Sequence, residues 1–173
     1  MHPRITELLG YIEQQTTELR NAFESVAADR RIVRPTPGRW SPAEVVHHVT
    51  IVERRLTPRL HALVEQARQF GPERDESSIL AIIQPRRAES RQRRVVTADA
   101  SEPRDTNVDT LWQDFDAARR DVTDAILAGD GLSLGQVSAP HPALGPLTGY
   151  GWIAFIGSHA ARHAAQIRED STS

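Results

Sequence analysis

Apolar residues recur every three or four positions along most of this chain, and that spacing limits the folds it can adopt. At 3.6 residues per turn, such a repeat places the apolar side chains on one face of an α-helix. Four segments have the repeat, and their apolar stripes cover residues 5–26, 45–63, 108–126 and 152–167. No segment predicts a β-strand. The sequence therefore predicts an all-α protein with four long helices.

The connections between these helices indicate their order in space. The first helix ends in a loop with Pro35, Pro37 and Gly38, and the fourth follows a loop rich in glycine and proline. Between the second and third helices lie roughly 35 residues, enough to travel the length of a bundle and allow parallel neighbours. We therefore predict a four-helix bundle in up-down-down-up order with one long crossover. Residues 1–173 are expected to form a single domain.

Capping residues predict where two of the helices begin. Ser41 is placed as an N-cap, with Pro42 at the first helical position and Glu44 at the third, which is a capping box. The third helix is expected to begin at Thr106 or Asn107. The fourth helix is expected from about residue 151 to residue 169.

Composition excludes several classes of function. The chain has no cysteine, so it has no disulfides, no thiolate metal ligands and no cysteine nucleophile of its own. Its net charge of −2 gives no overall attraction to nucleic acid or to an anionic membrane. No apolar run is long enough to span a bilayer, and no signal peptide is evident. A cytoplasmic protein with a small-molecule substrate is expected, without membrane or nucleic-acid partners.

Two histidines in the last helix raise the question of a metal site. His159 and His163 are four residues apart and lie on the apolar stripe of that helix, so their side chains point the same way. Buried imidazoles need polar partners, because an unsatisfied buried polar group costs about 1–3 kcal/mol. One metal ion would satisfy both rings, and hydrogen bonds within the core would do so as well. Spacing alone leaves both interpretations open.

A third histidine on the second helix favours the metal. His48 lies at the edge of that helix's apolar stripe, whereas His47 is rotated 100° away. His61 also faces elsewhere. Three histidines from two helices would leave coordination positions open for water or substrate, since no fourth protein ligand is evident.

Three further residues are candidates for roles beside such a site. Glu44 is a capping residue by its position, and it also lies one turn before His48, where it could hold a histidine N–H or a water molecule. Gln166 lies one turn after His163 and would donate to that water or bond to a loop. His141, just before the last helix, is either a general acid or base at the mouth of the site or a residue that stabilises a turn.

Two blocks of the sequence carry a family resemblance. The stretches "RWSPAEVVHHV" and "HPALGPLTGYGWIAFIGSHAARHAAQI" resemble the DinB-like (YfiT-like) superfamily of metalloenzymes. The resemblance implies a four-helix bundle that binds a divalent metal, commonly zinc or nickel, through three histidines. It assigns the metal to His48, His159 and His163, with His48 at the eighth place after Trp40. Homodimers also occur in that superfamily.

The resemblance also bears on activity. The superfamily includes transferases that use low-molecular-weight thiols, and three neutral histidines leave a bound cation its full charge, with which it activates water or a thiol. Because the chain has no cysteine, such a thiol must come from outside. We expect a metal-dependent thiol transferase or a hydrolase. The alternative is a non-catalytic stress-response protein that binds metal or a partner.

Two surfaces suggest partners. Small residues on the back of the fourth helix would let another helix approach closely, either from its own bundle or from a second copy in a homodimer; they are Ala154, Gly157, Ala161, Ala164 and Ala165. A basic patch lies in the long connection and consists of Arg86, Arg87, Arg91, Arg93 and Arg94. Because no aromatic residues interleave with these arginines, a solvated segment is expected there and not a nucleic-acid site.

Overall fold

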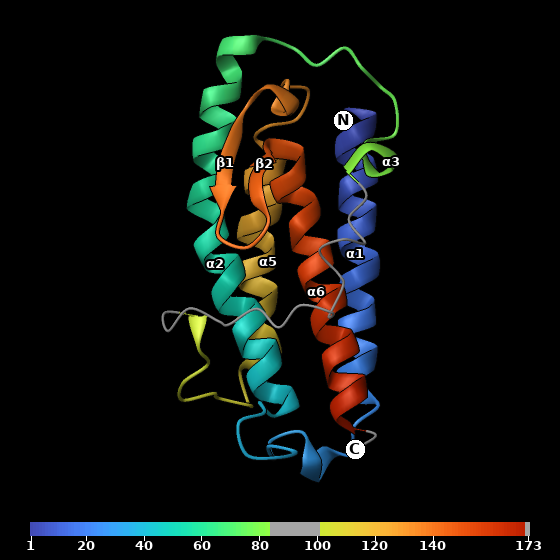
Figure 1. Cartoon of the computed structure of the whole chain (residues 1–173), viewed down its shortest axis with the longest axis vertical. Helices are drawn as coiled ribbons and strands as arrows, with labels where there is room; N and C mark the ends of the chain where they lie inside the picture. The colour runs from blue at the N-terminus through green and yellow to red at the C-terminus, as the bar shows by residue number, and fades with distance from the viewer. Residues whose placement is uncertain (84–100, 172–173) are drawn as a thin grey trace.

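The computed structural model describes residues 1–83 and 101–171 and has a mostly helical fold (Figure 1). Four long helices form a bundle: α1 (Pro3–Glu24), α2 (Pro42–Ala67), α5 (Leu111–Leu127) and α6 (Gly149–Ser171). The shorter elements are the helix α3 (Ile79–Ile83), the 3₁₀ helices η1 (Ala28–Arg30), η2 (Arg68–Phe70) and η4 (Leu134–Gln136), and the strands β1 (Ser138–His141) and β2 (Gly145–Thr148). The predicted all-α class is confirmed.

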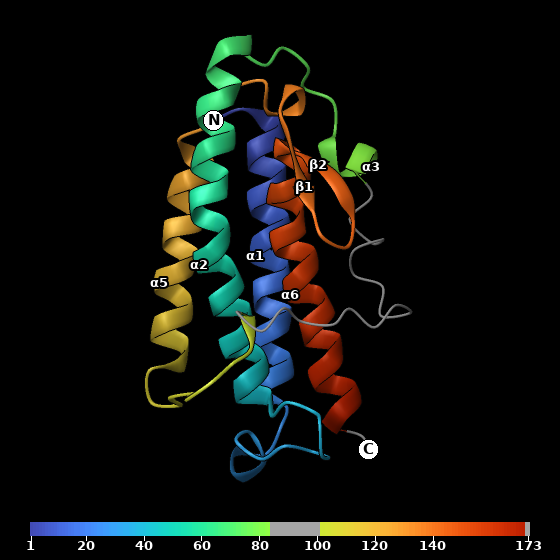
Figure 2. The same ribbon diagram turned by 60° about the vertical axis from the view of Figure 1, so that its left-hand side comes forward.

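The four long helices follow the predicted up-down-down-up order. Figures 1 and 2 show α1 and α6 running in one direction and α2 and α5 running in the other. The parallel neighbours α2 and α5 are joined by the long connection that contains α3, which returns the chain to the end of the bundle where α2 began. The start of α2 therefore lies beside the end of α6, because these two helices are antiparallel.

The start of α2 agrees with its sequence, but the start of α5 does not. The Ser41 hydroxyl accepts a hydrogen bond from the Glu44 amide at 3.2 Å, and the Glu44 carboxylate accepts one from the Ser41 amide at 2.8 Å. The prediction that the third long helix begins at Thr106 or Asn107 is wrong, since α5 begins at Leu111. The Asn107 side chain accepts a hydrogen bond from the Asp109 amide instead, which forms a local turn.

The hairpin β1–β2 was not predicted from the sequence. Its strands are antiparallel, with Ser138 opposite Thr148 and His141 opposite Gly145. Each strand has four residues and contains a proline, so neither shows the alternating pattern that identifies a strand. The hairpin lies along α2 and α6, to which it is joined by hydrogen bonds from Arg59 to the Pro140 carbonyl (2.9 Å) and from the Trp152 indole to the Ala139 carbonyl (3.2 Å) (Figure 1).

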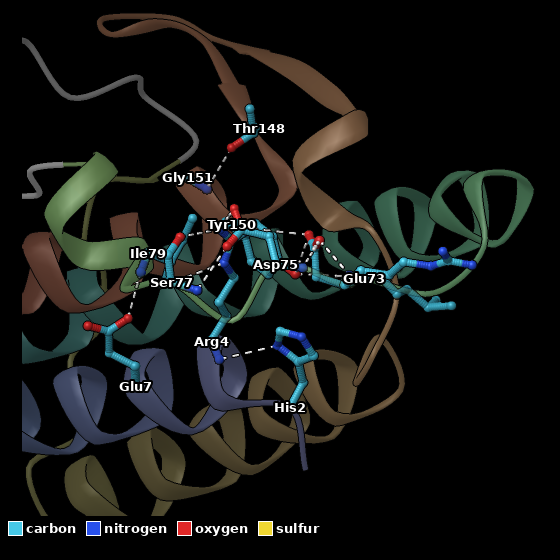
Figure 3. A network of polar contacts seen from close by, with 12 residues as sticks. His2, Arg4, Glu7, Glu73, Asp75, Ser77, Ile79, Thr148, Tyr150 and Gly151 are labelled. Atoms are coloured by element: carbon cyan, nitrogen blue, oxygen red, sulfur yellow. Dashed lines mark hydrogen bonds and ion pairs between the residues drawn. The ribbon is translucent and has the colours of Figure 1, made fainter.

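A buried arginine fastens the beginning of the long connection to α1 (Figure 3). The Arg4 guanidinium donates to the Ser77 carbonyl at 3.1 Å and forms ion pairs with Glu73 at 3.2 Å and Asp75 at 2.5 Å. The hydroxyl of Tyr150, in the first turn of α6, donates to the same Glu73 carboxylate at 3.2 Å. This network fixes the end of the bundle opposite to the start of α2.

Gly157, one of the small residues of α6, is packed against α1. A Cβ atom added at Gly157 would lie 2.4 Å from Cε1 of Tyr11, and the Tyr11 hydroxyl lies 3.2 Å from the Ser158 hydroxyl. Ala154 and Ala164 are also buried. Contact with α1 accounts for Gly157, whereas Ala161 and Ala165 are partly exposed, and the homodimer stays a prediction.

Two other expectations concern the surface. The basic patch at Arg86, Arg87, Arg91, Arg93 and Arg94 lies outside the described residues. Among residues 1–83 and 101–171, no helix combines the length and the apolar character that crossing a bilayer requires.

Gly149→Ala is expected to destabilise the protein by about 1–3 kcal/mol, because the new methyl group overpacks the start of α6. The added Cβ would lie 2.7 Å from the Leu134 carbonyl oxygen, which belongs to the backbone and cannot rotate away. Gly10→Ala is the matched control, because no atom lies within 4 Å of its added Cβ. At a helical position, alanine is more stable than glycine, so this variant should not be destabilised. Urea denaturation of both variants tests this; equal stability of the two would contradict it.

A buried ion pair joins α2 to α5. The Glu53 carboxylate accepts hydrogen bonds from the Arg119 guanidinium, one of them at 3.0 Å, and the two side chains are only 2% and 12% exposed. Burial raises the pKa of Glu53 to about 7, although the charge of Arg119 opposes the rise. Sequence analysis missed this pair, because Arg119 lies 66 residues beyond Glu53 and no local pattern links the two positions.

The raised pKa predicts a specific dependence of stability on pH. The folded protein retains a proton on Glu53 that the unfolded chain releases near pH 4.5. The stabilisation from this proton is therefore complete below about pH 4.5 and is lost as the pH rises through about 7. We expect the unfolding free energy of the wild type, measured relative to Glu53→Gln, to decrease over this range. A constant difference between the two proteins would show that the carboxyl has an ordinary pKa.

Candidate metal centre

Three histidines from two helices meet at one end of the bundle. His48 lies in the second turn of α2, where the capping box sets the helix start, and His159 and His163 lie on successive turns of α6. Because α2 and α6 are antiparallel, the beginning of one lies beside the end of the other. The ligand atoms of the three rings all lie within 4.8 Å of one another. Among the described residues this is the one group of three or more such side chains close enough to share an ion.

The distances between the rings suit one small cation. The ring centroids are 4.5 Å apart for His159 and His163, 4.8 Å for His48 and His163, and 5.2 Å for His48 and His159. The Nε2 atoms of His159 and His163 lie 3.1 Å apart. Two nitrogens bound to a tetrahedral zinc at ~2.05 Å would lie ~3.3 Å apart, close to this spacing. The residues present therefore fit a divalent metal.

Hydrogen bonds on the outer nitrogens orient two of the three rings. Nδ1 of His48 donates to the Ser101 carbonyl at 2.7 Å, and Nδ1 of His163 donates to the Gln166 side-chain oxygen at 3.0 Å. With the proton held on Nδ1, the lone pair of Nε2 points to the centre of the cluster. Outer partners of this kind fix the orientation and the tautomer of histidine ligands in metal sites.

The surroundings favour the neutral form of these rings, which is the form that binds metal. Burial lowers the pKa of His48, although its hydrogen bond to Ser101 opposes this. Burial also lowers the pKa of His159 well below its usual value, and the nearby positive charges of His163, His48, Arg162 and His141 lower it further.

Aromatic rings extend from the histidine cluster in two directions. The Trp40 ring lies 4.8 Å from the His48 ring, at the end of the bundle. On the other side, Phe155 lies 5.4 Å from His159 and 4.6 Å from His141, which belongs to strand β1. The cluster is therefore bordered by apolar surface along α6.

Glu44 caps the start of α2 and pairs with Arg34. Its carboxylate accepts hydrogen bonds from Arg34 at 2.6–3.0 Å in addition to the Ser41 amide. Burial alone would raise the pKa of Glu44, but the hydrogen bonds from Arg34 and Ser41 outweigh it and lower this pKa. Within the described part of the chain, no hydrogen bond joins Glu44 to His48.

The other two candidates lie closer to the cluster. Gln166 orients His163 through the hydrogen bond just described. The Nδ1 atom of His141 accepts hydrogen bonds at 3.1 Å from the amides of Ala143 and Leu144, so His141 stabilises the hairpin turn. Its ring also contacts Phe155, which places it on the same face of α6 as His159.

The remaining histidines of α2 face away, as predicted. His47 lies 2.9 Å from the Thr106 hydroxyl through Nδ1 and borders a pocket of about 100 Å³ on the α5 side. His61 is exposed. Sequence reasoning missed Ser101, because Ser101 and His48 are 53 residues apart in the chain and no local pattern predicts a contact between them.

Gln166→Ala is expected to weaken metal binding by about 10–100-fold, because His163 then loses the acceptor that holds its ring. The control is Gln66→Ala, which removes an exposed glutamine near the end of α2, distant from the cluster. Competition with a metal chelator measures both affinities. Equal affinities for wild type and Gln166→Ala would mean that the hydrogen bond to His163 does not support a metal ligand.

Comparison with known proteins adds one finding. A family model described as the DinB superfamily matches residues 11–167, which is most of the chain. No curated protein and no solved structure matches the chain.

Proposed function

The chain belongs to the DinB superfamily, and from this premise we propose that it is a divalent-metal-dependent enzyme that transfers a low-molecular-weight thiol to an electrophilic substrate. His48, His159 and His163 would hold the metal, with zinc or nickel as the expected ion. The observation that carries the proposal is the convergence of three imidazoles without a fourth histidine, cysteine or carboxylate beside them in the described residues. Structural zinc sites usually have four protein ligands, whereas catalytic sites keep a position open.

Neutral ligands suit this chemistry. A divalent cation held by three uncharged imidazoles retains its full charge and lowers the pKa of a thiol or a water that binds to it. Ser101 and Gln166 hold the rings of His48 and His163 in the orientation that such binding needs. The rings of Trp40 and Phe155 provide apolar borders that limit the access of water to the cluster.

The absence of cysteine determines where the nucleophile comes from. None of the 173 residues carries a thiol, so the reacting sulfur must belong to a small molecule. Hydrolysis is the second reaction that the same open position allows, with water in the place of the thiol.

The proposal is tested with untagged protein loaded with zinc or with nickel. The conjugation of 2-mercaptoethanol to 1-chloro-2,4-dinitrobenzene measures thiol transfer, and the hydrolysis of 4-nitrophenyl acetate measures water activation. We expect metal-dependent conjugation that is lost in His163→Ala and retained in His61→Ala, which removes an exposed histidine. Hydrolysis without conjugation would reassign the enzyme as a hydrolase. Full metal loading without either reaction would favour the non-catalytic metal-binding alternative.

A further inference from the structure

Two arginines lie on the same face of α2 as His48. Arg55 is seven residues beyond His48 and Arg59 is eleven, so both lie within about 20° of its direction around the helix. At 1.5 Å per residue, they are about 10 Å and about 16 Å from His48 along the helix axis. Both side chains are exposed. They therefore form a row that leads away from the histidine cluster.

Neither arginine is neutralised by a carboxylate within the described residues. One nitrogen of Arg55 donates to the Ser101 hydroxyl at 2.9 Å, and one nitrogen of Arg59 donates to the Pro140 carbonyl at 2.9 Å. By contrast, the adjacent Arg54 faces α5 and pairs with Asp114 at 2.7 Å. The two guanidinium groups on the histidine face thus retain their charge and most of their hydrogen-bond donors.

Arg55 is held by a residue that also contacts His48, and Arg59 lies over a ring that adjoins the aromatic border of the cluster. Ser101 accepts a hydrogen bond from Arg55 through its hydroxyl and from His48 through its carbonyl. Arg59 lies 4.6 Å from the Trp152 ring, and Trp152 and His141 lie 5.2 Å apart. The aromatic border of the cluster therefore continues to Arg59. Such anchoring reduces the entropy lost when a ligand is bound.

The charges on this face select a class of ligand. Planar guanidinium groups bind carboxylate and phosphate through paired, charge-assisted hydrogen bonds. We infer that Arg55 and Arg59 recognise an oxyanion, a carboxylate or a phosphate ester, at the far end of a substrate whose reacting group lies at the metal. This inference rests on the proposed function and names the chemistry of its substrate.

The test compares two thiols that differ only in charge at the far end. The protein is loaded with cobalt(II), and binding of 6-mercaptohexanoate and of 6-mercaptohexanol is followed by the absorption band that a thiolate gives on this metal. We expect the acid to bind about tenfold more tightly, the effect of one charge-assisted hydrogen-bond pair. In Arg55→Gln/Arg59→Gln the two thiols should bind equally, with the alcohol unaffected.

The matched control is Arg54→Gln/Arg68→Gln, which removes the same charge from the other sides of the helix. This variant should keep the preference for the acid. Equal binding of the two thiols by the wild type, or an unchanged preference in Arg55→Gln/Arg59→Gln, would overturn the inference and leave the metal proposal intact. Competition by hexyl phosphate and by hexanoate shows which oxyanion is preferred.

A second readout separates this inference from the proposed thiol chemistry. If no thiol binds to the cobalt, thiol transfer is wrong, and the heat of adipate binding then decides the role of the arginines. Binding of adipate to the wild type that is lost in Arg55→Gln/Arg59→Gln would support anion recognition by these residues. Absence of binding, or equal binding to both proteins, would overturn it.

Discussion

His159→Ala is expected to cause a large loss of zinc affinity, because it removes one of the three proposed ligands. Its effect should exceed the 10–100-fold loss that is typical when an outer hydrogen-bond partner of a ligand is removed. The Nε2 of His159 lies 3.1 Å from that of His163, and its ring contacts both other histidines. Chelator competition at neutral pH measures the loss.

The control for this variant is His47→Ala, next to the proposed ligand His48 but directed toward Thr106 and α5. Its zinc affinity should stay close to that of the wild type. If His159→Ala and His47→Ala bind zinc equally well, the histidine cluster is a hydrogen-bonded core and not a metal site.

Glu53→Ala is expected to lower the unfolding free energy by about 3 kcal/mol at pH 8, where this carboxyl is ionised. Removing one member of a buried ion pair leaves the other charge without compensation, and losses of this size are typical. Arg119 is only 12% exposed and one of its nitrogens, Nη1, is buried without a hydrogen-bond partner among the described residues. In Glu53→Ala, water therefore has little access to the Arg119 guanidinium and solvates its charge poorly.

The double variant Glu53→Leu/Arg119→Met removes both charges and is expected to regain the stability that Glu53→Ala loses. Glu65→Ala, which affects an exposed pair with Arg68, serves as the control and should change stability by less than about 0.5 kcal/mol. Urea denaturation at pH 8 measures all three variants. A small effect of Glu53→Ala would show that water reaches Arg119 in the folded protein.

Most of the fold was predictable from regular local patterns in the sequence. The capping box at Ser41 and Glu44 fixes the start of α2, and the apolar repeat fixes which face of each helix is buried. The same periodicity singled out His48 over His47, because a rotation of 100° separates their directions. The clustering of His48, His159 and His163 was predictable to this extent because the three residues lie on two regular helices.

Features that depend on distant contacts were not predictable. The hairpin β1–β2 is held against Arg59 and Trp152 by its backbone carbonyls, and its short proline-containing strands carry no repeat. The shift of the start of α5 to Leu111 has a local cause instead. The Asn107 side chain accepts a hydrogen bond from the Asp109 amide in a turn, and this turn competes with the helix start that the sequence predicted.

The same limit applies at the metal centre. Ser101 holds His48 through a backbone carbonyl, which any residue type would provide. The sequence therefore does not show that residue 101 contacts His48. Gln166 had a visible signal, since a residue three positions after His163 lies on the same side of α6. Its role as the acceptor for Nδ1 of His163 became evident only from the geometry.

The measurement that tests the central claim most directly is diffraction from crystals of the untagged, zinc-loaded protein, with data collected on both sides of the zinc absorption edge. The account predicts one anomalous peak at ~2.0–2.1 Å from a ring nitrogen of His48, His159 and His163. It also predicts that the remaining ligands of that zinc are not protein atoms. Absence of a peak among these rings, or a fourth protein side chain bound to the ion, would contradict it.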